Sequence, residues 1–137
     1  AKRAFMTTAF RNIGLSGDYG GSWLLPRLVG LAKAKELYYT ADRVSAEEAV
    51  QLGLINKVFS DETFREEAQA YARALANGPS GALSLMKVNL NQGLNQSLRE
   101  SLVLEAKHLV ESSGSKEAGE AITAFMEKRP PVFDRDS

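Results

Sequence analysis

The clearest pattern of hydrophobic and polar positions lies between residues 60 and 76. Apolar side chains recur there at intervals of three and four residues, at Phe64, Ala68, Tyr71, Ala72 and Leu75. This spacing places all five on one face of an α-helix. Ser60 and Asp61 stand just ahead of the pattern and predict its N-terminal cap. We therefore expect a helix over residues 61–76 with one buried face.

Further helices are predicted in the second half of the chain. Ser97 and Glu100 have the spacing of a capping box, in which each side chain satisfies a free amide of the first helical turn. The helix that follows, over residues 97–112, has an apolar face made of Leu98, Leu102, Ala106 and Leu109. Glycine, serine and proline breaks separate it from two other predicted helices, at residues 82–90 and 116–128.

The first 60 residues mix short strands with short helices. Residues 5–15 predict a weak strand and turn, and residues 54–59 predict a second short strand. Helices are predicted between them, from Ser22 to Gly30, from Ala32 to Tyr39, and from a capping box at Ser45 to Gly53. Helices this short must bury their apolar faces on something else, either a segment outside this sequence or a partner chain.

Composition excludes several classes of function. The 137 residues fit one domain, with 44% hydrophobic and 25% charged residues as in an ordinary globular protein. The 17 basic and 17 acidic residues balance, and the sequence has no polybasic run. Neither a nucleic-acid partner nor a membrane surface is therefore expected. No apolar run approaches the roughly 20 residues that a membrane span needs.

The sequence contains no cysteine, which excludes disulfides, thiolate catalysis and cysteine-based zinc sites. This fits a reducing compartment, and we expect a cytoplasmic protein; the first ten residues lack the long apolar core of a secretory signal. His108 is the only histidine and lies among the leucines of the 97–112 helix. Since no second ligand accompanies it, no metal site is expected.

One acidic residue stands out by its setting. Asp18 lies in the stretch GLSGDYGG, between small turn residues and just ahead of a predicted helix. Such an aspartate is typical of a turn or a helix cap. It is also suited to general acid–base chemistry, because a helix N-terminus favours a negative group and glycines allow a substrate to approach closely. The residues alone leave both interpretations open.

Four segments, taken in order, resemble the enoyl-CoA hydratase/isomerase family, also called the crotonase family. They are residues 5–30, the sequence YTADRVSAEEA at residues 39–49, the sequence GLINKV at residues 53–58, and AFMEKR at residues 124–129. The resemblance implies an α/β crotonase-type fold of which this chain is the mostly helical C-terminal half. Residues 1–60 would then form the end of the spiral core with the catalytic turn. Residues 61–137 would form a helical region for oligomerisation and coenzyme A contact.

The resemblance also implies chemistry. Family members bind an acyl-CoA thioester and stabilise its enolate with two backbone amides, so coenzyme A is part of the substrate and no separate cofactor is expected. The position of Asp18 is a catalytic acid–base in members of the isomerase kind. Hydratases carry a glutamate eight residues earlier, where this chain has Phe10. An apolar ring cannot move protons, so isomerisation is expected in preference to hydration, with Asp18 as the catalytic residue.

Four side chains are expected to contact the substrate: Phe10, Trp23, Phe125 and Lys128. Trp23 is a candidate for the acyl pocket, although an aromatic residue on a helix is more often core. For Phe125 and Lys128, one helical turn apart, the resemblance implies contact with the adenine and the phosphates of coenzyme A. The alternative for this pair is a core phenylalanine and a solvated lysine.

The family also implies an assembly, a homotrimer or a hexamer made of two trimers. The half that carries the oxyanion amides would lie upstream of this sequence. The chain is therefore expected to be the second half of a longer enzyme and to be inactive alone. A competing hypothesis, which Phe10 keeps open, is a non-catalytic helical oligomerisation module or a degenerate homologue. Decarboxylase, lyase and dehalogenase activities also remain open, because these reactions share the scaffold.

Overall fold

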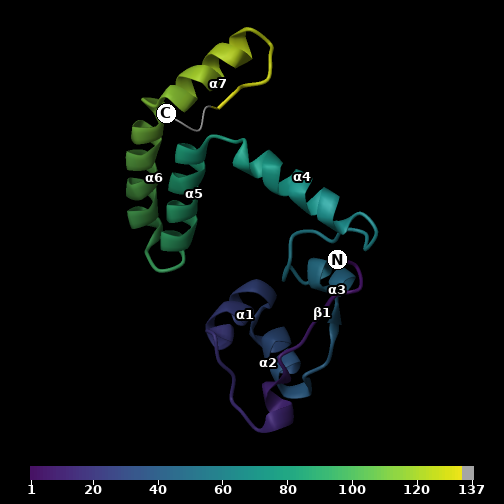
Figure 1. Cartoon of the computed structure of the whole chain (residues 1–137). Coiled ribbons are helices and arrows are strands. Elements are labelled where there is room, and N and C mark those ends of the chain that lie inside the picture. The colour runs from purple at the N-terminus through teal and green to yellow at the C-terminus, as the bar shows by residue number, and fades with distance from the viewer. Residues whose placement is uncertain (134–137) are drawn as a thin grey trace. The chain divides into compact units, whose positions relative to one another are not determined.

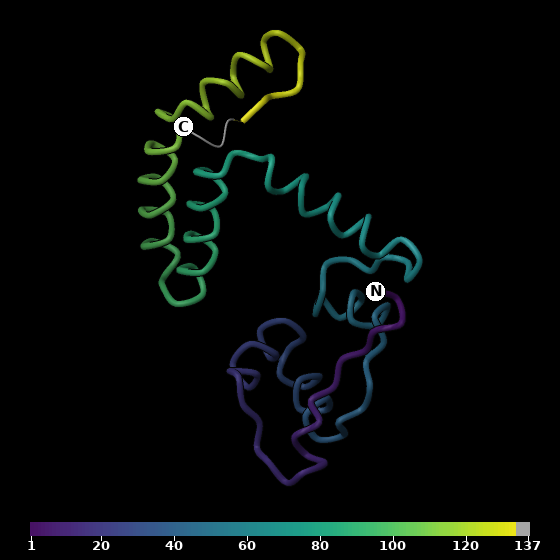
Figure 2. Tube along the Cα trace, in the orientation of Figure 1, coloured from purple at the N-terminus to yellow at the C-terminus, as the bar shows by residue number. Residues whose placement is uncertain are grey.

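The structure is a computed structural model that describes residues 1–133. The chain divides into two compact units, and the boundary between them along the sequence falls between Gln69 and Ala70. Helix α4 (Phe64–Ala76) leads from the first unit into the second. The path of the chain through each unit can be followed in Figures 1 and 2.

The first unit is built around a two-stranded antiparallel sheet. Strand β1 (Phe5–Met6) pairs with β2 (Val44–Ser45), with Met6 opposite Val44. A short 3-10 helix and two α-helices connect these strands, and a third α-helix follows the second strand. They are η1 (Ala9–Ile13), α1 (Gly21–Val29), α2 (Leu31–Thr40) and α3 (Ala46–Gln51).

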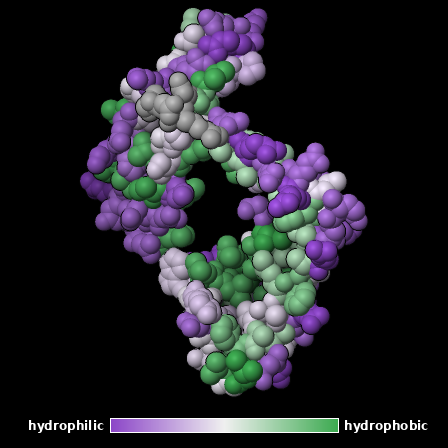
Figure 3. Space-filling model, in the orientation of Figure 1, coloured by the Kyte–Doolittle hydropathy of each residue, from purple (hydrophilic) through white to green (hydrophobic). Residues whose placement is uncertain are grey.

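The core of this unit is small. Leu37 of α2, Val44 of β2 and Ala49 of α3 are buried together, and partly buried leucines, isoleucine and valine surround them. Other large apolar side chains are exposed, including Ile13 at 71% and Leu31 at 61%. Figure 3 shows the resulting hydrophobic surface on the first unit. A surface of this kind fits the expectation that another segment or chain covers it.

The strand predicted over residues 54–59 does not form. The backbone amides of Leu54 and Ile55 donate to the carbonyl oxygen of Ala49, at 2.8 and 3.3 Å. They therefore end α3 and are not available to a sheet. The second strand lies at Val44–Ser45 instead, where the sequence predicted only a cap. Ser45 serves as that cap as well, because its hydroxyl accepts from the amide of Glu48 at 3.1 Å.

Helix α4 begins at Phe64, so the predicted start at residue 61 was wrong. The side chains of Ser60 and Asp61 form hydrogen bonds outside the helix. The Ser60 hydroxyl accepts from the amide of Glu62 at 3.3 Å, and the Asp61 carboxylate accepts from the amide of Arg3 at 3.1 Å. The carbonyl of Thr63 accepts the first helical hydrogen bond. The two polar residues thus form a turn and hold the N-terminal segment.

The second unit contains three further helices, α5 (Ser80–Gly93), α6 (Leu98–Ser113) and α7 (Lys116–Met126). Helices α5 and α6 lie side by side, joined by a short turn (Figures 1 and 2). The predicted capping box at Ser97 is confirmed, because Ser97 and Glu100 each accept from the other's backbone amide. His108 is buried, with its Nδ1 2.5 Å from Oδ1 of Asn89, so it links α6 to α5.

Helix α7 supplies the cap of α5. The carboxylate of Glu117 accepts from the amides of Gly81 and Ala82, at 3.1 and 3.4 Å, and from the Ser80 hydroxyl. Desolvation raises the pKa of Glu117, but these hydrogen bonds outweigh it and leave the pKa below its ordinary value. A side chain at Gly81 would stand 3.0 Å from the carboxylate. The cap therefore accounts for a helix that starts at Ser80, earlier than residue 82.

Candidate functional site

The turn that carries Asp18 has an unusual backbone. Gly17, Tyr19 and Gly20 all have positive φ angles, of 110°, 57° and 70°. Two hydrogen bonds close the turn on Asp18. Its carbonyl accepts from the amide of Gly21 at 3.1 Å, and its Oδ1 accepts from the amide of Tyr19 at 2.7 Å. A positive φ is costly for a residue as large as tyrosine, so this turn stores backbone strain beside the candidate catalytic residue.

Asp18 does not cap the helix that follows it. The N-cap of α1 is Gly20, which has no side chain, and its carbonyl accepts from the amides of Trp23 and Leu24. Asp18 is exposed, and within residues 1–133 only its Oδ1 is hydrogen-bonded. The second carboxylate oxygen is therefore open to a ligand. Such a group can accept a proton from a bound substrate and return it.

Phe10 and Trp23 lie on the elements before and after this turn. Phe10 is half-buried in η1, and its carbonyl accepts from the amide of Leu15 at 3.0 Å. Trp23 is 42% exposed on α1. The guanidinium of Arg27 lies 3.7 Å from the centre of its ring and also donates to its carbonyl at 2.8 Å. One face of the tryptophan is therefore covered by a cation.

Two pockets of the first unit lie close to these elements. One, of about 180 Å³, lies between the turn and α2 and is lined by Ser16, Ser22, Pro26 and Tyr38 among others. The second, of about 130 Å³, is lined by Thr8, Leu25, Leu37 and Val44 among others. Asp18, Phe10 and Trp23 do not line either pocket. The described chain therefore places the three candidates near the turn but does not gather them around one cavity.

The candidates for coenzyme A contact lie at the end of α7 in the second unit. Phe125 is 85% exposed, which argues against a core role within this unit. The helix ends at Met126, so the expected helix through residue 128 was wrong. Lys128 has φ 56°, its amide donates to the carbonyl of Phe125, and the next amide donates to Ala124. This is a Schellman cap with lysine at the position that usually holds glycine.

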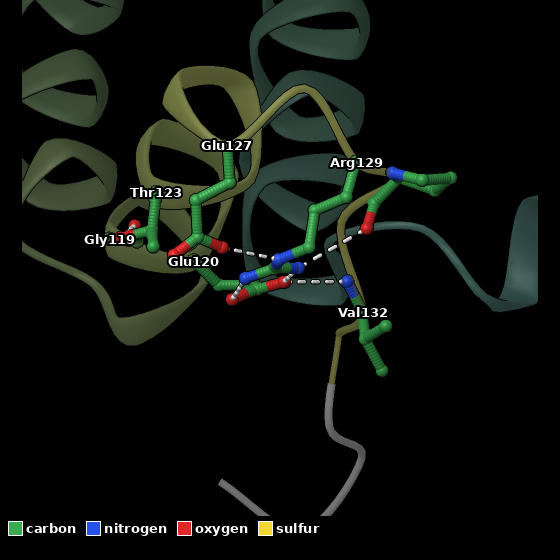
Figure 4. Close-up of polar contacts among 7 residues, drawn as sticks. Gly119, Glu120, Thr123, Glu127, Arg129 and Val132 are labelled. Atoms are coloured by element: carbon green, nitrogen blue, oxygen red, sulfur yellow. Dashed lines mark hydrogen bonds and ion pairs between the residues drawn. The ribbon is translucent and has the colours of Figure 1, made fainter.

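The residue after Lys128 is held by a charged cluster that the sequence pattern did not reveal. Arg129 forms two hydrogen bonds with Glu120, at 2.6 and 3.0 Å, and one with Glu127 at 2.6 Å. Glu120 also accepts from the amide of Val132 at 2.8 Å (Figure 4). Glu120 and Glu127 are not three or four positions from Arg129, the spacing at which side chains on a helix meet, because Arg129 lies beyond the end of α7. The cluster fixes the segment that follows the Lys128 cap.

The charged cluster lowers the pKa of Glu120. Hydrogen bonds from Arg129 first, and then from the amide of Val132, lower it from 4.5 to about 2. Because the folded-state pKa lies below the ordinary value, the carboxylate stabilises the folded chain above about pH 4.5. That contribution is lost as the pH falls from about 4.5 towards 2.

We therefore expect Glu120→Gln to lower the thermal unfolding midpoint at pH 7. The difference from wild type should shrink between pH 4.5 and pH 2, where wild-type Glu120 becomes protonated. Unfolding followed by circular dichroism across this range would measure it. Glu111→Gln, which removes an exposed charge from α6, is the matched control. A difference that is the same at pH 7 and pH 2 would contradict the assignment of the stability to the carboxylate.

Residues 1–133 contain no group of three or more histidine, aspartate or glutamate side chains placed to hold a metal ion. Among the same residues, no helix combines the length and the apolar character that crossing a membrane requires.

Comparison with known proteins places the chain among its relatives. The model of the enoyl-CoA hydratase/isomerase family matches residues 1–136. A Rhodobacter capsulatus protein named probable enoyl-CoA hydratase is 41% identical over 133 residues, which are 97% of this chain and 52% of the relative. The 1,2-epoxyphenylacetyl-CoA isomerase of Escherichia coli is 38% identical, over 97% of this chain and 51% of the relative.

A solved structure agrees with these relatives. The crystal structure of an enoyl-CoA hydratase from Polaromonas superposes with a TM-score of 0.92 at 35% identity, over 98% of this chain and 52% of that chain. The chain thus spans about half the length of the relatives it matches. The expected crotonase-type fold is confirmed. The chain belongs to the enoyl-CoA hydratase/isomerase family.

Proposed function

We propose that this chain is part of an acyl-CoA enzyme that isomerises an enoyl-CoA or a related thioester by moving a proton through Asp18. The observation that carries the proposal is the Asp18 carboxylate, which is exposed on a strained turn and has one oxygen open to a ligand. The family match supports the substrate class. The relative named 1,2-epoxyphenylacetyl-CoA isomerase supports isomerisation.

The proposed step needs one carboxylate in this chain. Asp18 accepts a proton from a carbon of the acyl group, and the electron pair moves onto the thioester oxygen to form an enolate. Asp18 then returns the proton to another carbon of the acyl group. The amides that hold the enolate oxygen belong, in this proposal, to the upstream half of the complete protein. Phe10 favours this reaction over water addition, because its ring cannot activate water.

Coenzyme A contact is proposed for the end of α7. The exposed ring of Phe125 offers a stacking surface for the adenine. The ammonium of Lys128 is suited to a phosphate, because charge-assisted hydrogen bonds to phosphate are strong. We also propose that the complete protein is cytoplasmic and assembles as a trimer or a pair of trimers. Leu98 and Leu109 of α6, 75% and 70% exposed, fit such packing.

A second candidate is a helical oligomerisation module without catalytic activity. The phenylalanine at position 10, where hydratases carry a glutamate, is the observation that favours it. A degenerate member of the family would keep its apolar helix faces and assemble without binding an acyl-CoA.

Titration calorimetry with an acyl-CoA separates the two candidates. The complete protein is expected to bind with a Kd of about 1 μM to 1 mM, the range in which the KM values of enzymes typically lie. Residues 1–137 alone are expected to bind about tenfold more weakly or worse, because they lack the thioester-binding amides that this proposal assigns to an upstream half. A complete protein that forms oligomers in sedimentation but shows no acyl-CoA binding would support the module and contradict the enzyme.

A further inference from the structure

The side chain of Tyr38 lies against the turn that carries Asp18. Tyr38 is half-buried on α2, and its ring occupies the space above two glycines of the turn. A Cβ atom built on Gly17 would stand 2.8 Å from Cε1 of this ring, and one built on Gly21 would clash with the Tyr38 hydroxyl. The turn can approach α2 this closely only because both positions lack a side chain.

The middle of the turn, residues 16–19, has no hydrogen bond to a distant part of the described chain. Its hydrogen bonds are local, because both of them join Asp18 to Tyr19 or Gly21. Within residues 1–133, no hydrogen bond connects residues 16–19 to α2. Helix α2, in contrast, is fixed by the burial of Ala34 and Leu37. Tyr38 therefore lies between a fixed helix and the middle of the turn. The ends of the turn are held through η1 and α1, both of which contact α2, as in the hydrogen bond from the Thr8 hydroxyl to the carbonyl of Leu37 at 2.7 Å.

We propose that Tyr38 is a positioning residue for Asp18, which deepens the proposed isomerase function and rests on it. Its ring packs against Gly17 and Gly21, and this contact sets where the Asp18 carboxylate stands. Backbone held at positive φ persists only where the surrounding structure holds it, so packing has to support this turn. Proton transfer is sensitive to this choice, because a displacement of about 1 Å can cost about 100-fold in rate.

The contact can be tested at Gly21, where the backbone is ordinary and alanine introduces no φ strain. Gly21→Ala in the complete protein would push the Tyr38 hydroxyl aside and displace ring and turn together. We expect kcat to fall by about 10- to 100-fold with little change in KM. Removing the hydroxyl makes room, because the next ring atom, Cζ, lies 3.5 Å from the new Cβ, an ordinary contact. The double variant Gly21→Ala with Tyr38→Phe should therefore recover most of the lost kcat.

The neighbouring tyrosine provides the matched control. Tyr39 precedes the end of α2 and is 67% exposed, and a Cβ on Gly21 would not meet it. Gly21→Ala combined with Tyr39→Phe should stay as impaired as Gly21→Ala alone. A variant that lost activity only through unfolding would instead show a lower melting temperature and a lower active fraction, with an unchanged kcat per folded enzyme.

Asp18→Asn in the same assay distinguishes failure of this inference from failure of the proposed function. If Asp18→Asn abolishes turnover but Gly21→Ala keeps the wild-type kcat, or Tyr38→Phe fails to rescue it, the positioning role of Tyr38 is wrong and the function stands. If Asp18→Asn keeps turnover, both are overturned. Loss in Gly21→Ala with recovery only in the Tyr38→Phe double variant would establish the coupling.

Discussion

Asp18→Asn in the complete protein is expected to lower kcat by about 100- to 10,000-fold, the range attributed to a general acid–base group. Asparagine has nearly the same shape as aspartate, and its Oδ1 can still accept from the amide of Tyr19, as Asp18 does at 2.7 Å. The strained turn should therefore survive. The variant loses only the ability to accept a proton, because an amide is not basic at neutral pH.

The measurement is kcat together with the Kd for an acyl-CoA, and the Kd should stay close to wild type. Asp42→Asn is a matched control, since Asp42 is another exposed aspartate of the first unit and its carboxylate has no hydrogen bond within residues 1–133. It should keep its turnover. An Asp18→Asn variant with full turnover would show that Asp18 only shapes the turn and is not catalytic.

The second large effect is expected at Lys128, with opposite consequences for stability and for binding. Lys128→Gly removes a side chain from a left-handed position, where a non-glycine residue costs about 1 kcal/mol or more. The variant should therefore unfold at a higher temperature than wild type. It also removes the ammonium proposed to contact phosphate, so acyl-CoA affinity should fall by about tenfold or more, the effect of losing one charge-assisted hydrogen bond.

Lys128→Ala separates the two effects. Alanine removes the charge but keeps a Cβ in the left-handed conformation, so affinity should fall as in Lys128→Gly without the gain in stability. Melting temperatures and calorimetric titrations on the three proteins measure both quantities. Unchanged affinity in both variants would show that Lys128 does not contact the substrate, and its strained backbone would then need another explanation.

Periodicity and caps predicted the helices well, because those signals act over a few residues. The capping box at Ser97 and the apolar spacing in α4 belong to this class. The errors arose where a backbone or side-chain group had a choice of partners. Leu54 and Ile55 bond back to α3 instead of pairing in a sheet, and Asp61 binds the N-terminal segment instead of starting α4. Local sequence does not decide between such partners.

The candidate site likewise has features that the local sequence predicted and contacts that it did not. The sequence and the family resemblance singled out Asp18, and the glycines around it predicted a turn. They did not reveal that Tyr38 packs on Gly17 and Gly21, since that contact brings together residues about 20 positions apart. The sequence did not predict the cluster of Arg129 with Glu120 either, because these contacts form only when the chain reverses direction after α7.

The identity of the reaction product tests the central claim most directly. The complete protein would be incubated with an enoyl-CoA, and the product analysed by mass spectrometry and by NMR of the acyl chain. Isomerisation through Asp18, with Phe10 unable to activate water, predicts a product of unchanged mass with a relocated double bond. A product heavier by one water molecule would contradict the account, because it would require a second proton-transferring group at the position we assign to an inert ring.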